Sequence, residues 1–200
     1  MRKLTAGLFI TLDGVVESPQ KWHFPYINDE VMRAVAAQTE GADTMLMGRR
    51  TYQEWAAYWP LQGDDVPFAS AINGISKLVA STTLATVDWQ NCRLIDADLV
   101  ADVTVRKAGT GGDMAVAGSP SLVAYLLEHD LVDELNLLVH PLALGHGRRL
   151  FPAEANTVRM QLVRSTPFEN GVLDVMYRPV KEATDRESRH GCEEQAQEVG

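Results

Sequence analysis

Apolar runs that end in a glycine and then open into a helix are the feature that most constrains the fold of this chain. The run over 44–47 is followed directly by Gly48 and by a helical pattern. We expect this helix to extend through Trp59, with Pro60 ending it, because proline cannot continue a helix. A strand that feeds straight into a helix is typical of parallel sheets, in which the helices cover the faces of the sheet.

The same order recurs later in the chain. The run over 114–117 is followed by Gly118, by Ser119 as the expected helix N-cap, and by Pro120 at the first helical position. Apolar residues at helical spacing give the new helix one inward-facing stripe. The stripe contains Leu122, Val123, Leu126 and Leu127.

The remaining elements complete a mixed sheet. Before residue 133 we expect strands over 4–12 and 77–80 and a weak helix over 98–107. We also expect a helix over 29–39, capped by Asn28, with inward-facing Val31, Met32, Val35 and Ala36. After residue 133, three strands follow without helices between them, over 134–140, 158–165 and 172–178. The sequence therefore predicts a three-layer α/β fold with a mostly parallel sheet and antiparallel C-terminal strands.

Charge and composition limit the partners and the domain organisation. The net charge is −9, and phosphate backbones repel such an acidic chain, so we expect no nucleic-acid partner. The N-terminal apolar run is too short for a signal peptide, and no stretch suits a membrane span. The two cysteines, Cys92 and Cys192, lack metal-ligand spacing, so we expect no metal. We interpret the chain as a soluble cytoplasmic domain over 1–180 with a charged flexible tail over 181–200.

Three strand ends combine small or hydroxyl residues with free backbone amides. They are Gly48-Arg49-Arg50-Thr51, Ser81-Thr82 and Ala117-Gly118-Ser119. Each feature alone is equally typical of a turn or a helix cap, and no GxGxxG or Walker motif is present. In an open α/β sheet, however, ligands bind beyond the carboxyl ends of the strands. Three such ends together suit an elongated phosphorylated ligand such as a dinucleotide.

The order of these motifs along the chain resembles one family. Leu12-Asp13-Gly14, Met47-Gly48-Arg49-Arg50-Thr51-Tyr52, Ala117-Gly118-Ser119 and Leu144-Gly145-His146-Gly147-Arg148-Arg149-Leu150-Phe151 occur in the same order in the dihydrofolate-reductase-like superfamily. The branch that the sequence is most similar to is the reductase domain of riboflavin biosynthesis, the RibD C-terminal domain. The resemblance spans about 2–178. It implies a dihydrofolate-reductase-like fold, a homodimer, and an NADPH-dependent reductase of a small heterocycle.

The resemblance also assigns the cofactor site. It implies that the residues around the cofactor are Ile10, Asp13, Gly14, Gly48, Arg49, Thr51, Ser81, Thr82, Ala117, Gly118, Ser119 and Leu122. Among them, Ser81 and Thr82 match the strand end that faces the adenosine 2′-phosphate. Many dihydrofolate reductases have arginine where this chain has Thr82. This difference leaves the choice between NADPH and NADH open.

The substrate side has fewer candidates. The resemblance places a carboxylate on the first helix, where this chain has Asp29 and Glu30, although acidic residues favour a helix's first turn on dipole grounds alone. Trp22 and Tyr26 precede that helix and could either stack on a flat substrate or cover the core. His140 suits a structural role better. The resemblance implies a substrate that is a uracil-type ribosylamine, a dihydrofolate or a related heterocycle. The alternative is a dinucleotide-binding regulatory module without turnover.

Overall fold

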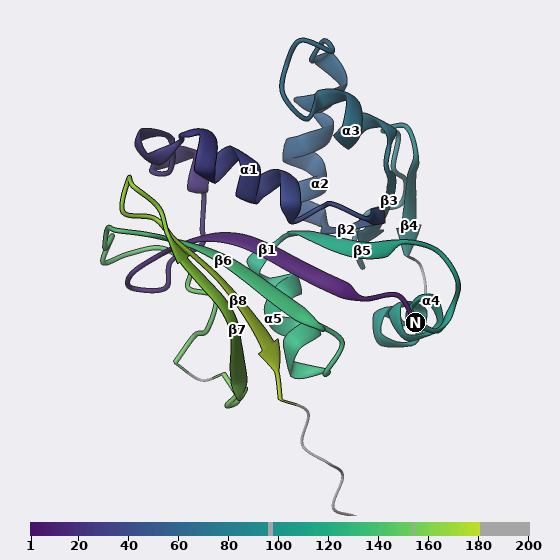
Figure 1. Ribbon diagram of the computed structural model, residues 1–200. Coiled ribbons are helices and arrows are strands. Elements are labelled where there is room, and N and C mark those ends of the chain that lie inside the picture. The colour runs from purple at the N-terminus through teal and green to yellow at the C-terminus, as the bar shows by residue number, and fades with distance from the viewer. Residues whose placement is uncertain (96–97, 154, 181–200) are drawn as a thin grey trace, which may run out of the picture.

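Eight strands form one mixed sheet in the order β4-β3-β2-β5-β1-β6-β8-β7 (Figure 1). The computed structural model describes residues 1–95, 98–153 and 155–180, so the tail expected over 181–200 lies outside the described residues. The strands are β1 Leu4–Thr11, β2 Ala42–Gly48, β3 Ser76–Ala80, β4 Cys92–Ile95, β5 Asp113–Gly118, β6 Glu134–His140, β7 Met160–Pro167 and β8 Leu173–Pro179.

Helices cover both faces of this sheet. They are α1 Asp29–Ala37, α2 Arg49–Ala56, α3 Ala69–Gly74, α4 Leu99–Ala108 and α5 Pro120–Glu128, together with the 3-10 turns η1 Pro19–Lys21, η2 Phe24–Tyr26 and η3 Trp59–Leu61. Figure 1 shows α1, α2 and α3 on one face and α4 and α5 on the other. These are the three layers that the alternating pattern predicts. Among the described residues, no helix is long and apolar enough to cross a membrane.

The alternation of side chains along β1 assigns residues to the two layers. Ile10 is buried in the core that α5 covers, together with Leu122 and Leu126. Phe9 points to the opposite face, where it packs with Val31 of α1. This alternation follows from the two-residue period of a strand. Neighbouring residues of β1 therefore contribute to different layers of the molecule.

The C-terminal strands are antiparallel, as the sequence predicts. β6 is parallel to β1, and β8 pairs antiparallel with both β6 and β7. β7 is the edge strand, and its Leu162 and Val163 are exposed. Exposed edges are usually paired or covered. The homodimer stays a prediction that this edge is consistent with.

The structure corrects one sequence-based boundary and one expected inward-facing residue. The helix after β2 ends at Ala56, and Pro60 lies in the separate turn η3. The Tyr58 N–H binds the Trp55 carbonyl, which is three residues back rather than the four of an α-helix, so the chain has already tightened into a turn. Ala36, expected to face inward, is exposed, whereas Val31 of the same helix is buried. The sequence patterns also missed the short elements α3 and β4.

Candidate functional site at the carboxyl edge of the sheet

Six parallel strands, from β4 across to β6, end at one edge of the sheet. The junctions that follow β3, β2 and β5 are neighbours there, since Gly48 pairs with Ala80 and Met47 pairs with Gly118. The sequence predicts that these junctions contact one phosphorylated ligand. The topology places all three side by side. We call the segments 48–51, 81–82 and 117–119 the junction edge.

The first and third junctions lie in direct contact. A Cβ atom added to Gly48 would lie 2.7 Å from the Ser119 hydroxyl oxygen. Gly118 has a φ of +114°, and a Cβ atom there would lie 3.1 Å from Thr51 Oγ1. Gly118 requires glycine because of its backbone conformation, and any Cβ atom at Gly48 would force the Ser119 hydroxyl to move. The start of α2 and the start of α5 therefore form one continuous surface.

Both helices start without a side-chain cap. Gly48, the N-cap of α2, has no side chain, and the Ser119 hydroxyl makes no capping bond to α5 among the described residues. The Ser119 hydroxyl lies 3.1 Å from Ser121 Oγ instead. Neither helix has an acidic residue in its first turn. Their free amides and positive dipole ends suit an anion, and the exposed Arg49 adds a positive charge beside them.

The second junction offers less to a ligand than its sequence indicates. The Ser81 hydroxyl accepts hydrogen bonds from the backbone N–H groups of Thr83 at 3.1 Å and Leu84 at 3.0 Å. Its oxygen therefore holds the turn in place. Thr82 is exposed, so it has the more accessible hydroxyl of the two.

The turn after β1 is held by the Asp13 carboxylate. This carboxylate accepts hydrogen bonds from Thr11 Oγ1 at 2.5 Å, from the Gly145 N–H at 2.8 Å and from the Leu144 N–H at 3.2 Å. These bonds, that of Thr11 above all, lower the pKa of Asp13 to about 2. Asp13 therefore ties the end of β1 to the loop after β6. Gly14 completes the turn with a φ of +83°.

Three expected cofactor contacts have side chains that pack into the core. Ile10 and Leu122 are buried in the core on the α5 face. Ala117 is half-buried and packs with Met47 and Tyr52 on the other face. These residues shape the edge from below through packing and backbone position. The side chains and amides that the junction edge presents come from 48–51, 82 and 118–119.

The expected catalytic carboxylates lie on the first turn of α1. Asp29 is exposed. Glu30 Oε2 accepts hydrogen bonds from the backbone N–H of Glu169 at 3.0 Å and from Asn28 Nδ2 at 3.2 Å. Glu30 therefore fixes the turn between β7 and β8 to α1. Their catalytic role stays a prediction.

The expected substrate-stacking residues belong to a larger cluster of rings. Trp22 is buried, and its Nε1–H donates to the Glu17 carbonyl at 3.0 Å. Tyr26 is half-buried and meets the His140 ring edge-on. Phe9 and His23 complete what we call the aromatic cluster, Phe9, Trp22, His23, Tyr26 and His140. The sequence places Trp22, His23 and Tyr26 in one aromatic loop but does not bring Phe9 and His140 to them, because Phe9 and His140 become neighbours only through the pairing of β1 with β6.

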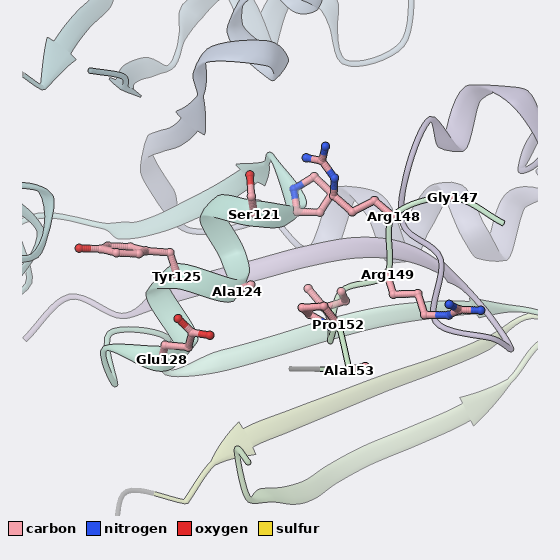
Figure 2. Close-up of a pocket in the computed structure, with 11 residues that line it drawn as sticks. Ser121, Ala124, Tyr125, Glu128, Gly147, Arg148, Arg149, Pro152 and Ala153 are labelled. Carbon is pink, nitrogen blue, oxygen red and sulfur yellow. The ribbon is translucent and has the colours of Figure 1, made fainter. Parts of the chain in front are cut away.

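A pocket of about 660 Å³ lies between α5 and the loop over 147–153 (Figure 2). Arg148 and Arg149 line it and extend in different directions in Figure 2. The Arg149 Nε–H donates to the Asp13 carbonyl at 2.8 Å, so this guanidinium supports the turn after β1. The pocket borders α5 on its outer side, whereas the aromatic cluster lies on the α1 face of the sheet. The pocket is therefore separate from the aromatic cluster.

Comparisons with known proteins agree with this architecture. YyaP of Bacillus subtilis (strain 168), an uncharacterized protein, is 27% identical over 186 residues, covering 88% of this chain and 94% of YyaP. A solved protein from Shewanella sp. PV-4, provisionally assigned to riboflavin biosynthesis, is 20% identical with a TM-score of 0.73, covering 90% of this chain and 99% of that one.

A structure of dihydrofolate reductase from Enterococcus faecalis, complexed with NADP(H) and RAB-propyl, shares the fold at 15% identity. Its TM-score is 0.61, and the match covers 90% of this chain and 97% of the reductase. The fold is therefore dihydrofolate-reductase-like, as the sequence motifs predict. The model of the RibD C-terminal domain matches residues 2–173. The chain belongs to the RibD C-terminal domain family.

Proposed function

We propose that this protein is an NADPH-dependent reductase of a small heterocyclic substrate. The observation that carries the proposal is the pair of uncapped helix starts, which meet where Gly48 approaches Ser119. The free amides at the start of α2 and the Ser121 amide at the start of α5, where Pro120 has no N–H, suit the two phosphates of a dinucleotide. The family membership supports a reductase rather than another nucleotide-binding protein.

The residues present fit the diphosphate of such a cofactor. Gly48 and Gly118 leave room for a close backbone approach, and Arg49 and Thr51 offer a guanidinium and a hydroxyl beside the amides. Thr82 is the exposed hydroxyl at the strand end where the adenosine 2′-phosphate is expected. When bound, the cofactor supplies a hydride. The chain's own residues would bind the cofactor, orient it across the ends of β2, β5 and β1, and hold a second ligand beside it.

The candidates for the proton donor are the two carboxylates that the sequence indicates on α1, Asp29 and Glu30. Asp29 has the freer carboxylate of the two, because Glu30 already binds the Glu169 N–H. A proton donor on the α1 face would lie on the same side of the sheet as Phe9 and Tyr26. We therefore propose that the substrate approaches from that face.

Ligand titration followed by turnover tests the proposal. Purified protein is titrated with NADPH and with NADH, using the fluorescence of the reduced nicotinamide. NADPH oxidation is then followed by absorbance with pterin, pyrimidine, quinone and flavin substrates. We expect saturable NADPH binding and oxidation only when a suitable heterocycle is added. Absence of binding of either nucleotide would overturn the proposal. Tight NADPH binding without turnover would favour the regulatory module instead.

A further inference from the structure

His140 is the centre of the aromatic cluster and is fully buried, with an exposed fraction of 0%. Three rings stand nearly perpendicular to its imidazole. The ring centroids of Trp22, Tyr26 and Phe9 lie 5.2, 5.4 and 5.5 Å from that of His140. Apolar residues such as leucine would fill such a site without any polar atom to satisfy. The imidazole at the centre therefore needs an explanation.

The hydrogen bonds of His140 define which nitrogen carries the proton. Its Nδ1 lies 2.9 Å from the Leu138 carbonyl oxygen. A carbonyl only accepts hydrogen bonds, so Nδ1 must carry the hydrogen. Burial lowers the pKa of His140, which favours the neutral ring. In the neutral ring Nε2 then has a lone pair, and it is a hydrogen-bond acceptor.

The backbone carbonyls of Leu138 and Ile10 both act on the ring, but a carbonyl cannot donate a hydrogen bond, so Nε2 has no donor among the described residues. Buried side-chain nitrogen or oxygen atoms without a partner are few in the described part of the chain, namely His140 Nε2, His23 Nδ1 and Gln38 Nε2. Two of these atoms lie in the aromatic cluster, where the rings of His23 and His140 are 6.5 Å apart. Buried polar atoms are usually satisfied. Two unsatisfied nitrogens in one apolar cluster point to a ligand that binds them.

The position of His140 places such a ligand beside the junction edge. His140 is the last residue of β6 and pairs with Thr11 at the end of β1. β1 lies between β6 and β5, whose end carries Gly118. Two strand spacings of about 4.8 Å separate the ends of β6 and β5 by about 10 Å. A flat molecule at His140 would thus lie next to a cofactor that spans the ends of β2, β5 and β1.

The cover of the cluster consists of short turns. Trp22, His23 and Tyr26 come from the segment of η1 and η2, two 3-10 turns of three residues each. Ser18 begins this segment in a left-handed conformation, with a φ of 47°. Short turns of this kind can shift without unravelling a helix. A planar ligand that binds His140 requires this segment to move outward.

We propose that His140 Nε2 accepts a hydrogen bond from a ring N–H of the substrate, and that this bond selects planar heterocycles with an N–H donor. The inference rests on the proposed function and adds the chemistry by which the substrate is recognised. Phe9, Trp22 and Tyr26 provide the apolar walls on either side of the ring. Analogues that are methylated at the donor nitrogen lack the hydrogen that Nε2 requires.

The test uses the full chain and pairs of probes. The probes are lumazine, pterin and uracil, each beside its analogue methylated at the ring nitrogens. Binding is measured with and without NADPH by tryptophan fluorescence and by the ¹⁵N shift of the His140 imidazole. We expect the N–H probes to shift the Nε2 signal and the methylated analogues to bind at least about tenfold more weakly. If none of the N–H probes moves the Nε2 signal, the inference is overturned.

Two variants separate recognition from packing. His140→Phe keeps a ring in the cluster but removes the acceptor. We expect it to retain NADPH affinity and thermal stability and to lose the preference for N–H probes. His129→Phe, at an exposed histidine after α5, is the matched control and should keep that preference. A His140→Phe protein that still prefers N–H probes would overturn the inference. Loss of NADPH binding in the unaltered protein would overturn the proposed function instead, because the probe measurements do not require NADPH.

Discussion

The helices of this protein begin in two different ways. α1 and α4 are capped by their own side chains, since Asn28 Oδ1 accepts from the Val31 N–H at 3.0 Å and Asp98 Oδ1 accepts from the Ala101 N–H at 2.9 Å. Both also have acidic residues in the first turn. α2 and α5 have neither feature. The capped helices start apart from each other, whereas α2 and α5 start in contact at neighbouring strands.

This difference indicates where the chain leaves room for a ligand. A side-chain cap typically stabilises a helix by about 1 kcal/mol, and an acidic residue in the first turn adds about 0.3–1 kcal/mol. The chain has this stabilisation at α1 and α4 and lacks it at α2 and α5. An anion bound at the junction edge would supply it there. The contacts that bind the anion would then also stabilise the starts of α2 and α5.

The largest effect on NADPH affinity is expected from a substitution that pushes apart the starts of α2 and α5. Gly48→Val places a side chain against Ser119, whose hydroxyl lies 2.7 Å from the position of the new Cβ atom. Overpacking of this kind costs about 1–3 kcal/mol and also fills the space for a phosphate, so we expect NADPH affinity to fall by about 100-fold or more. Isothermal titration measures the affinity.

The control for this variant is Gly74→Val at the end of α3. A Cβ atom on Gly74 would meet no atom within 4 Å. It should leave NADPH affinity unchanged. Equal affinities for the two variants would show that the contact between α2 and α5 is only a packing feature.

The next effect concerns the charge beside the uncapped starts. Arg49→Ala should weaken NADPH binding by about 1.5–3 kcal/mol, the contribution of a hydrogen bond to a charged group. Arg50, the following residue on α2, is equally exposed and is the control. If Arg50→Ala weakens binding as much as Arg49→Ala does, the arginines act only through their summed charge.

A smaller effect is expected when α5 receives an acidic residue in its first turn, as α4 has. This change should raise stability and lower NADPH affinity. Ser121→Asp puts a carboxylate in the first turn of α5. The free energy of unfolding should rise by about 0.3–1 kcal/mol, because the charge complements the helix dipole. NADPH affinity should fall by about tenfold through repulsion of the phosphates. Ala101→Asp in α4 is the matched control and should leave NADPH affinity unchanged. A Ser121→Asp protein that binds NADPH normally would place the anion elsewhere.

The contrast between these regions also explains what the sequence could predict. The junction edge is built from backbone amides and small residues at fixed offsets after strands, so local patterns such as Gly48-Arg49 and Gly118-Ser119 predict it. The parallel sheet and its antiparallel finish follow from the spacing of apolar runs. β4 and α3 are short and weakly apolar, and their formation depends on packing against β3 and Trp89.

The aromatic cluster could not be predicted in the same way. Phe9 and His140 are neighbours only because β1 pairs with β6, and nothing in the local sequence fixes that pairing. The role of Asp13 was missed for the same reason. Its partners Leu144 and Gly145 lie more than a hundred residues away, and they give Asp13 a structural role beside the cofactor contact, which stays a prediction. Local patterns predict features that are built from the backbone, whereas clusters of distant side chains require the structure.

The Asp13 carboxylate accepts hydrogen bonds from backbone amides, in contrast to the uncapped helix starts, and its contribution to stability can be tested by pH. Its pKa of about 2 lies below the value of about 3.9 in an unfolded chain. The carboxylate therefore stabilises the folded state fully above about pH 4, and this contribution disappears as the pH falls toward 2. Asp13→Asn should unfold at lower urea concentration than the unaltered protein at pH 6, and the two curves should converge near pH 2. The exposed Asp65→Asn is the control. A difference that persists at pH 2 would mean that packing, not the charge, is lost.

The smallest effect on cofactor affinity is expected at the capped helix α1. Asp29→Asn and Glu30→Gln each remove one charge from its first turn, while the Asn28 cap remains. Because the start of α1 is already occupied by the Asn28 cap, NADPH affinity should change by less than about twofold, well below 0.5 kcal/mol. Turnover is the informative second measurement, since a catalytic carboxylate contributes about 10²–10⁴-fold to the rate. Loss of turnover in only one variant would identify the residue that donates the proton.

Glu30→Gln also loses a charged acceptor for the Glu169 N–H, so a fall in its unfolding temperature must be separated from a fall in its rate. If either variant weakens NADPH binding as strongly as Arg49→Ala does, the distinction between capped and uncapped helix starts does not define the cofactor site.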